Sequence, residues 1–230
     1  MNPSGDLVLL FAELGESDCE DIGDGFLNQP VNAISSGAYT LFGLWLVWRA
    51  MRRRGDEKSV EIFYGLALAG VGIGSIAFHG PVPPGARLLH DLTIAAVLAV
   101  IAARNLGVLL GWQRRAILGT AGLVTIAIGA VMAVAPDAGN LLTGVVGAAA
   151  VATEVIVYRT GRRRFSQRVA RILIGVGVLL VTAGIINVLG RTGGPICDPD
   201  SLFQGHAVWH ALTAAAFMLY GYTAFPSGSD

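Results

Sequence analysis

Three histidines and one aspartate lie within or at the ends of apolar segments long enough to span a bilayer: His79, Asp91, His206 and His210. A titratable side chain at membrane depth costs about 2.5 kcal/mol or more unless it is paired or bound to a metal, so these side chains are candidates for function. The spacing His206-x-x-x-His210 places two imidazoles on one helix face, and Ser75 stands in the same relation to His79. These residue types at this spacing indicate a metal site.

The chemistry that follows is the activation of water. Three neutral imidazoles with one open position form a ligand set typical of catalytic zinc, and His79, His206 and His210 supply it. Zinc lowers the pKa of bound water to about 7 and polarises a carbonyl oxygen. Asp91 is the nearest carboxylate along the expected topology and is the candidate base, while Ser75 is a candidate hydrogen-bond donor to a developing oxyanion.

Other polar residues have simpler interpretations. A single histidine in a membrane helix can hydrogen-bond a neighbouring carbonyl group, and a serine such as Ser75 often bonds its own backbone. His90 is next to Asp91 but on another helix face, so we expect it to support the site or to lie at the interface. Glu154 and Asn187 have no partner that the sequence identifies, and internal hydrogen bonding is their expected role.

The composition is that of a polytopic membrane protein. Hydrophobic residues make up 53% of the chain, charged residues only 14%, and the mean hydropathy is +0.62. A soluble domain has roughly a quarter of its residues charged. The net charge is zero and no basic patch is interleaved with aromatic residues, which excludes nucleic-acid binding.

Seven apolar segments of about 20 residues follow one another along the chain, and this is the length that a helix needs to cross a hydrocarbon core about 30 Å thick. We therefore expect an all-α bundle of seven transmembrane helices in a single domain. It comprises an N-terminal segment (1–31), the helix bundle (32–225) and a tail (226–230). The expected helices are residues 32–51, 60–79, 86–106, 115–134, 141–158, 169–189 and 206–225.

The positions of the arginines predict the orientation. Lys and Arg gather in the connections after the first, third and fifth expected helices, whereas the other connections hold only Arg87 and Arg191. Short loops rich in Lys and Arg remain cytoplasmic. We therefore expect the N-terminus outside and the C-terminus in the cytoplasm, with Ser75, His79 and Asp91 near the outer leaflet.

The segment before the first helix has two features. Residues 7–14 are apolar but too short to span, and they lack a basic lead-in and a small-residue cleavage site, so an interfacial helix is expected in place of a signal peptide. The two cysteines, Cys19 and Cys197, both fall outside in the expected topology. That compartment permits a disulfide, and two free thiols are the alternative.

The five candidate site residues together resemble the motif of the alkaline ceramidase family, within the CREST superfamily of seven-helix membrane hydrolases. Further segments look like that family: Cys19-Glu20, residues 30–35 at the start of the first helix, and residues 204–210. The resemblance covers most of the chain, and it is the combination of motifs that is specific.

The resemblance implies a zinc-dependent amidase that cleaves ceramide, or a related N-acyl lipid, to a fatty acid and a sphingoid base. It implies that His79, His206 and His210 bind zinc and that Ser75 and Asp91 sit beside the metal-bound water. It also implies that the two cysteines form a disulfide.

One departure from the family concerns calcium. Some eukaryotic members bind Ca²⁺ through the segment before the first helix, using acidic side chains near the Cys-Glu motif and a Glu shortly before the Asn. Glu20 is kept here, whereas Gln29 replaces the second Glu. Calcium prefers six to eight oxygen ligands, so this loss weakens the expected site, and Asp18, Asp21 and Asp24 are the carboxylates that would compensate.

Two other functions stay open at this point. Receptor-type members of the superfamily bind ligands without hydrolysis but have the opposite orientation. A metal transporter would need polar residues that continue to the inner leaflet, and the helices beyond Ser75 and His210 are largely apolar. The chain has many arginines and a single lysine, Lys58, a bias that is typical of GC-rich genomes. We therefore expect a bacterial-type enzyme in the cell membrane. The sequence specifies neither its oligomeric state nor its exact lipid substrate.

Overall fold

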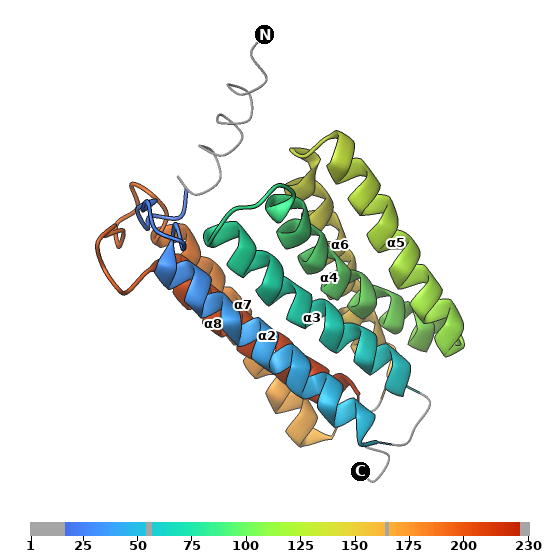
Figure 1. The fold of residues 1–230 in the computed structure, drawn as a ribbon. Helices are drawn as coiled ribbons and strands as arrows, with labels where there is room; N and C mark the ends of the chain where they lie inside the picture. The colour runs from blue at the N-terminus through green and yellow to red at the C-terminus, as the bar shows by residue number, and fades with distance from the viewer. Residues whose placement is uncertain (1–16, 54–56, 164–165, 226–230) are drawn as a thin grey trace.

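A computed structural model describes residues 17–53, 57–163 and 166–225, and all regular structure in these ranges is helical (Figure 1). This confirms the all-α class for the described residues, and each expected helix overlaps an observed one with ends that differ by a few residues. The interfacial helix expected over residues 7–14 lies outside the described ranges. The helices are α2 (Pro30–Met51), α3 (Lys58–His79), α4 (Ala86–Leu110), α5 (Arg114–Val134), α6 (Ala138–Arg159), α7 (Gln167–Leu189) and α8 (Gly205–Ala224).

Local sequence explains where several of these helices begin and end. Pro30 is the first residue of α2, where its missing N–H removes no helical hydrogen bond. The Ser166 hydroxyl accepts a hydrogen bond from the Val169 N–H and so caps the start of α7. At the end of α4, Gly111 adopts the left-handed conformation with φ 69°, which glycine tolerates without a steric cost.

Five helices, α3 to α7, are long and apolar enough to cross a membrane, so the chain is a multi-pass membrane protein. The helices α2 and α8 do not reach the same hydropathy, and their role as spans remains a prediction. Both carry buried polar side chains, which lower their mean hydropathy. These side chains include Asn32 and Ser36 in α2 and His210 and Thr213 in α8.

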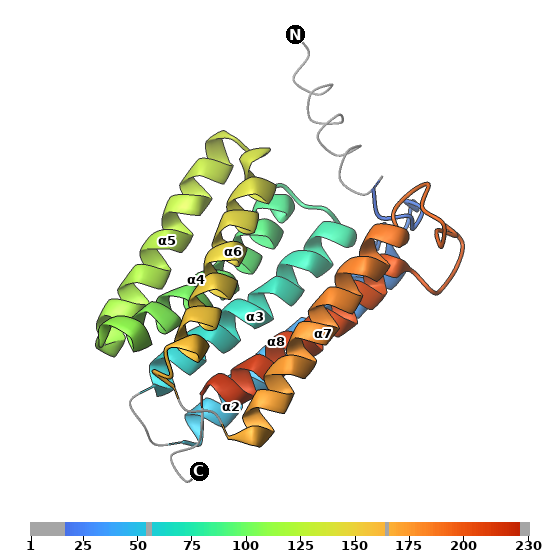
Figure 2. The ribbon, with the colours of Figure 1, turned by 180° about the vertical axis from the view of Figure 1, so that it is seen from behind.

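The helices pack as a bundle in which α6 and α7 do not approach each other closely. The helix α2 lies between α3 and α8, α7 packs on α8, and α4 packs on α3, α5 and α6. No Cα atom of α6 lies within 8 Å of one in α7 or α8. In Figure 2, α3 is accordingly visible between α6 and α7.

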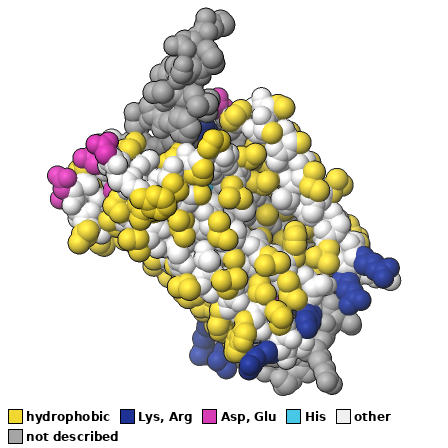
Figure 3. All heavy atoms as spheres, in the orientation of Figure 1, with side chains coloured by type: hydrophobic (Ala, Val, Ile, Leu, Met, Phe, Trp, Pro, Cys, Tyr) yellow, Lys and Arg dark blue, Asp and Glu magenta, His cyan; other side chains and the backbone are white. Residues whose placement is uncertain are grey.

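Charged side chains separate toward the two ends of the bundle. In Figure 3, Lys and Arg gather at one end of the visible face and Asp and Glu at the other. We call the end where α2 finishes and α3 begins the arginine end, and the end where α3 finishes at His79 and α8 begins the site end. At the arginine end, Arg49 and Arg53 both pair with the buried Glu61 at 3.1 and 2.9 Å. This asymmetry agrees with the expected orientation, which remains a prediction.

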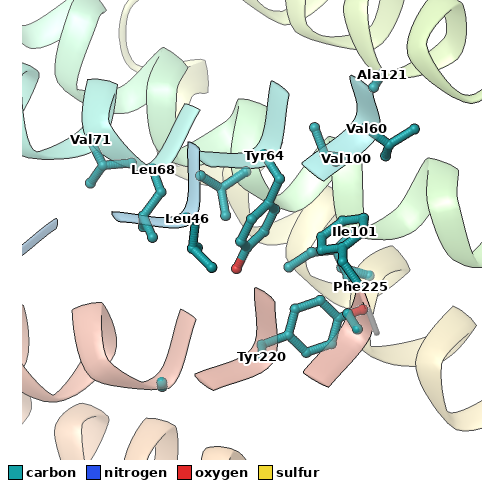
Figure 4. Packing of buried hydrophobic residues seen from close by; sticks show 14 of the residues in the cluster. Leu46, Val60, Tyr64, Leu68, Val71, Val100, Ile101, Ala121, Tyr220 and Phe225 are labelled. Carbon is teal, nitrogen blue, oxygen red and sulfur yellow. The ribbon is translucent and has the colours of Figure 1, made fainter. Parts of the chain in front are cut away.

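The main apolar core fills the half of the bundle nearer the arginine end (Figure 4). Tyr64 is fully buried there, beside the rings of Tyr220 and Phe225 at 6.2 and 5.7 Å between centroids. Its hydroxyl donates to the Phe217 carbonyl at 2.8 Å, so the ring is buried without an unpaired polar atom. This packing fixes α3 against α8.

The expected disulfide between Cys19 and Cys197 is present, with 5.6 Å between the two Cα atoms. Hydrogen bonds run alongside it: the Thr192 N–H donates to the Ser17 carbonyl, and the Cys19 N–H donates to the Thr192 hydroxyl. The segment before α2 is therefore held against the α7–α8 connection at the site end.

Candidate metal centre

Helix ends bring three histidines together. His79 is the last residue of α3, while His206 and His210 occupy the first two turns of α8. One ring nitrogen of each lies within 4.8 Å of those of the other two, and the ring centroids are 4.4 to 5.3 Å apart. Among the described residues, these three form a group that could hold a metal ion.

The ring of His79 is oriented by Gln29, which precedes α2. Its side-chain oxygen lies 2.7 Å from His79 Nδ1, and because an amide oxygen only accepts, Nδ1 carries the hydrogen. The Gln29 backbone N–H also donates to the His79 carbonyl at 2.8 Å. The lone pair of His79 is thus on Nε2, which is buried and has no hydrogen-bond partner.

The ring of His206 has the same arrangement. The Asn187 side-chain oxygen, from α7, lies 2.9 Å from His206 Nδ1, so the hydrogen is again on Nδ1. Its Nε2 is also buried without a hydrogen-bond partner. The Asp18 carboxylate lies 3.6 Å from the same Nδ1 and favours that tautomer.

Two serines of α2 orient His210. Its Nδ1 lies 2.9 Å from the Ser35 hydroxyl and 3.2 Å from the Ser36 hydroxyl. Both hydroxyls donate to the Asn32 carbonyl, which uses their only hydrogens. His210 Nδ1 must therefore be the donor, and Nε2 keeps its lone pair.

These three tautomers fit a metal ion. Each Nδ1 is bound by a side chain that fixes the ring, as is usual for metal-ligating histidines, and each Nε2 offers a lone pair in a site that water reaches poorly. Two buried nitrogens without partners, His79 Nε2 and His206 Nε2, would be costly unless a ligand met them. The donor set of three imidazoles suits zinc, with a coordination position left for water or substrate.

Ser75 lies in the site but is already hydrogen-bonded. It is fully buried, and its hydroxyl is 2.8 Å from that of Ser36 and 3.4 Å from His210 Nε2. The Ser75 hydroxyl can donate its hydrogen either to the Ser36 oxygen or to His210 Nε2. Its role as a donor to an oxyanion remains a prediction.

Asp91 reaches the site through His90. Its carboxylate accepts from His90 Nδ1 at 2.8 Å and lies 3.9 Å from Arg87, and it does not join the group of three histidines. The His90 ring stacks on Phe78 with 4.9 Å between centroids and lies 6.2 Å from the ring of His79. The structure therefore brings the His90 ring near that of His79, and Asp91 is hydrogen-bonded to His90.

The acidic residues considered for calcium do not come together as a metal-binding group. The two carboxylate oxygens of Glu20 accept from the backbone N–H groups of Val31 and Asn32, at the start of α2. Asp21 and Asp24 are exposed. In this geometry Glu20 acts as a helix cap, and the calcium expectation gains no support.

The sequence did not show that Gln29, Ser35, Ser36 and Asn187 orient the histidines, although it predicted internal hydrogen bonding for Asn187. Ser35 and Ser36 follow Asn32 by three and four positions, a spacing that would have shown their shared helix face. No local sequence pattern indicates that Gln29 and Asn187 bind histidine rings, because their partners, His79 and His206, are distant in the sequence. Glu154 bonds Asn105, Arg163 and Tyr220 away from the histidines, consistent with the internal hydrogen bonding expected for it.

Comparison with models of known protein families identifies a match. The family model described as Ceramidase matches residues 27–225, a range that contains all three histidines, Ser75 and Asp91. No curated protein matches the chain.

Proposed function

The chain belongs to the ceramidase family, hydrolases that act on the amide bond of ceramide, and we propose that it cleaves ceramide or a related N-acyl lipid with zinc held by His79, His206 and His210. The observation that carries this proposal is the convergence of the three imidazoles, each with Nδ1 hydrogen-bonded to a neighbouring side chain. The products are a fatty acid and an amine, the sphingoid base when the substrate is ceramide.

When bound, zinc would supply an activated water at neutral pH and polarise the carbonyl of the substrate. The protein must then move one proton from that water to the amine that leaves. His90 and Asp91 suit this task, because the Asp91 carboxylate holds His90 Nδ1–H and leaves His90 Nε2 able to accept a proton. Returning that proton to the leaving nitrogen restores the pair to its starting state.

The outer face formed by α6 and α7 suits a lipid substrate. No Cα atom of α6 lies within 8 Å of a Cα atom of α7, and both helices are mainly apolar. An N-acyl lipid entering from the bilayer could place its acyl chain along these helices and its amide at the site end. We place the site end on the outer side of the cell membrane, following the arginine distribution.

The test of this function combines metal analysis with lipid hydrolysis. The purified protein is expected to contain about one zinc per chain and to release fatty acid from at least one member of a panel of N-acyl lipids. His210→Ala removes one imidazole and is expected to abolish hydrolysis and lower the zinc content.

Thr223→Ala is the matched control for this variant. It lies on the same helix at the arginine end, and its hydroxyl bonds only carbonyls of its own helix. It should keep both zinc and activity. Full zinc and full activity in His210→Ala would disprove the proposed site.

A further inference from the structure

Asn32 is a fully buried polar residue whose side chain has no partner. Neither Nδ2 nor Oδ1 makes a hydrogen bond, although the backbone N–H of Asn32 donates to Glu20 and its carbonyl accepts from two serines. An unsatisfied buried polar group costs roughly 1–3 kcal/mol. The Asn32 amide could donate from Nδ2 and accept at Oδ1 but does neither, so a ligand is expected beside it.

The register of the helices places Asn32 at the level of the metal centre. The contact between Ser36 and Ser75 aligns α2 with α3, which run in opposite directions. Asn32 on α2 and His79 on α3 each lie one turn from this contact, toward the site end. Because residues four apart share a helix face, Asn32 is on the same face as Ser36, and His79 is on the same face as Ser75. His206 has the same relation to His210, whose ring bonds Ser36.

Three unpartnered buried groups therefore share one level: the Asn32 amide, His79 Nε2 and His206 Nε2. The two imidazole nitrogens suit a metal ion. An amide side chain is outside the usual ligand set of zinc, which consists of thiolate, imidazole and carboxylate groups. Its two N–H bonds suit instead an oxygen atom that gains negative charge beside the metal.

We infer that Asn32 is a catalytic residue that donates a hydrogen bond from Nδ2 to the scissile carbonyl oxygen of the bound lipid. This inference rests on the proposed hydrolysis of an N-acyl lipid. Asn32 would thus add a donor with two unpartnered N–H bonds to the hydroxyl of Ser75, which lies 2.8 Å from that of Ser36.

Two variants test the inference. Asn32→Leu replaces the amide by an apolar group of similar size, and Asn32→Ala removes it. Loss of one oxyanion donor typically lowers kcat by about 100-fold to 1000-fold, so we expect a loss of that order in both variants, with little change in KM. Zinc content should stay at the wild-type level. The melting temperature of Asn32→Leu should equal or exceed that of the wild type, because the variant no longer buries an unpaired amide.

Asn105→Ala is the matched control. Asn105 is also fully buried in a helix, but its Nδ2 donates to Thr153 and Glu154 away from the histidines. Its removal should lower the melting temperature and leave kcat within about threefold of the wild type. The opposite effects of the two deletions separate a catalytic role from a structural one.

A second readout does not depend on turnover. An N-acyl lipid with a ¹³C-labelled carbonyl, bound to zinc-free protein, should show a carbonyl infrared band at lower frequency than in detergent alone. The shift should persist in Asn105→Ala and disappear in Asn32→Leu.

The results separate the two proposals. If the wild type releases no fatty acid from any lipid in the panel, the proposed function fails. If the wild type is active and Asn32→Leu retains zinc and a kcat within threefold, the inference about Asn32 is wrong. Loss of zinc in both Asn32 variants would also overturn it, since Asn32 would then hold the metal.

Discussion

Each histidine of the candidate metal centre is oriented by a side chain from a different part of the chain. Gln29 binds His79 from the segment before α2, Asn187 binds His206 from α7, and Ser35 with Ser36 binds His210 from α2. Such partners fix the ring and the tautomer before a metal arrives. The affinity of the site should therefore depend on residues that do not touch the ion.

Gln29 allows the sharpest test at this scale. In Gln29→Leu, His79 Nδ1–H loses its acceptor, and we expect the zinc affinity to fall about 10-fold to 100-fold. Gln29→Glu keeps an acceptor at that position, although it loses the bond from Nε2 to the Glu20 carbonyl. We expect its zinc affinity to stay within about threefold of the wild type. Competition with a chromophoric chelator measures both, and equal affinities in Gln29→Leu and the wild type would contradict this role.

At the scale of elements, the site depends on how closely α2 approaches α3. A Cβ atom added at Gly43 would lie 2.3 Å from the Ala69 backbone nitrogen and 2.6 Å from the Gly65 carbonyl oxygen. Small residues allow membrane helices to pack backbone against backbone in this way. The same approach brings Ser36 to Ser75 further along the helices.

Gly43→Ala should therefore separate the two helices. We expect it to lower the melting temperature clearly and to reduce zinc binding, because Ser36 and His79 are carried by the helices that move apart. Gly37→Ala is the matched control on α2, where an added Cβ meets nothing within 4 Å. Helix propensity favours alanine there by up to about 1 kcal/mol, so this variant should be neutral or stabilising. Similar melting temperatures for the two variants would refute the close-packing argument.

At the scale of the whole molecule, contacts at both ends of the bundle join segments that are far apart in the sequence. At the arginine end, Arg49 donates to the carbonyls of Tyr222 and Phe225 and so ties α8 to α2. At the site end, the Cys19–Cys197 disulfide ties the segment before α2 to the connection that leads into α8. A disulfide persists in an oxidising compartment, which agrees with a site end outside the cytoplasm.

This orientation can be tested by labelling single cysteines, because Cys19 and Cys197 are bonded to each other and should not react. Asp24 and Arg115 are exposed at the site end and the arginine end respectively. A membrane-impermeant maleimide should label Asp24→Cys in intact cells stripped of any outer envelope, and Arg115→Cys only after permeabilisation. Labelling in the reverse pattern would show that the predicted orientation is wrong and that the site end faces the cytoplasm.

The sequence by itself determined the helical class and the approximate helix ends, and it predicted five site residues, of which the structure groups the three histidines. These follow from patterns that are local in the chain, namely apolar length, charge between segments and the four-residue spacing of Ser75 with His79 and of His206 with His210. The expected topology permitted a disulfide between the two cysteines, the family resemblance implied it, and the structure contains it.

Only the tertiary structure decided which side chains orient these residues. Gln29 meets His79 fifty positions away, and Ser36 meets His210 at a separation of 174 positions, so no local pattern contains either contact. The same packing brought the His90 ring near that of His79, brought Ser75 to Ser36, and left the amide of Asn32 buried without a partner. Hydrogen-bond satisfaction is a property of the packed bundle, because each donor and acceptor comes from a different helix.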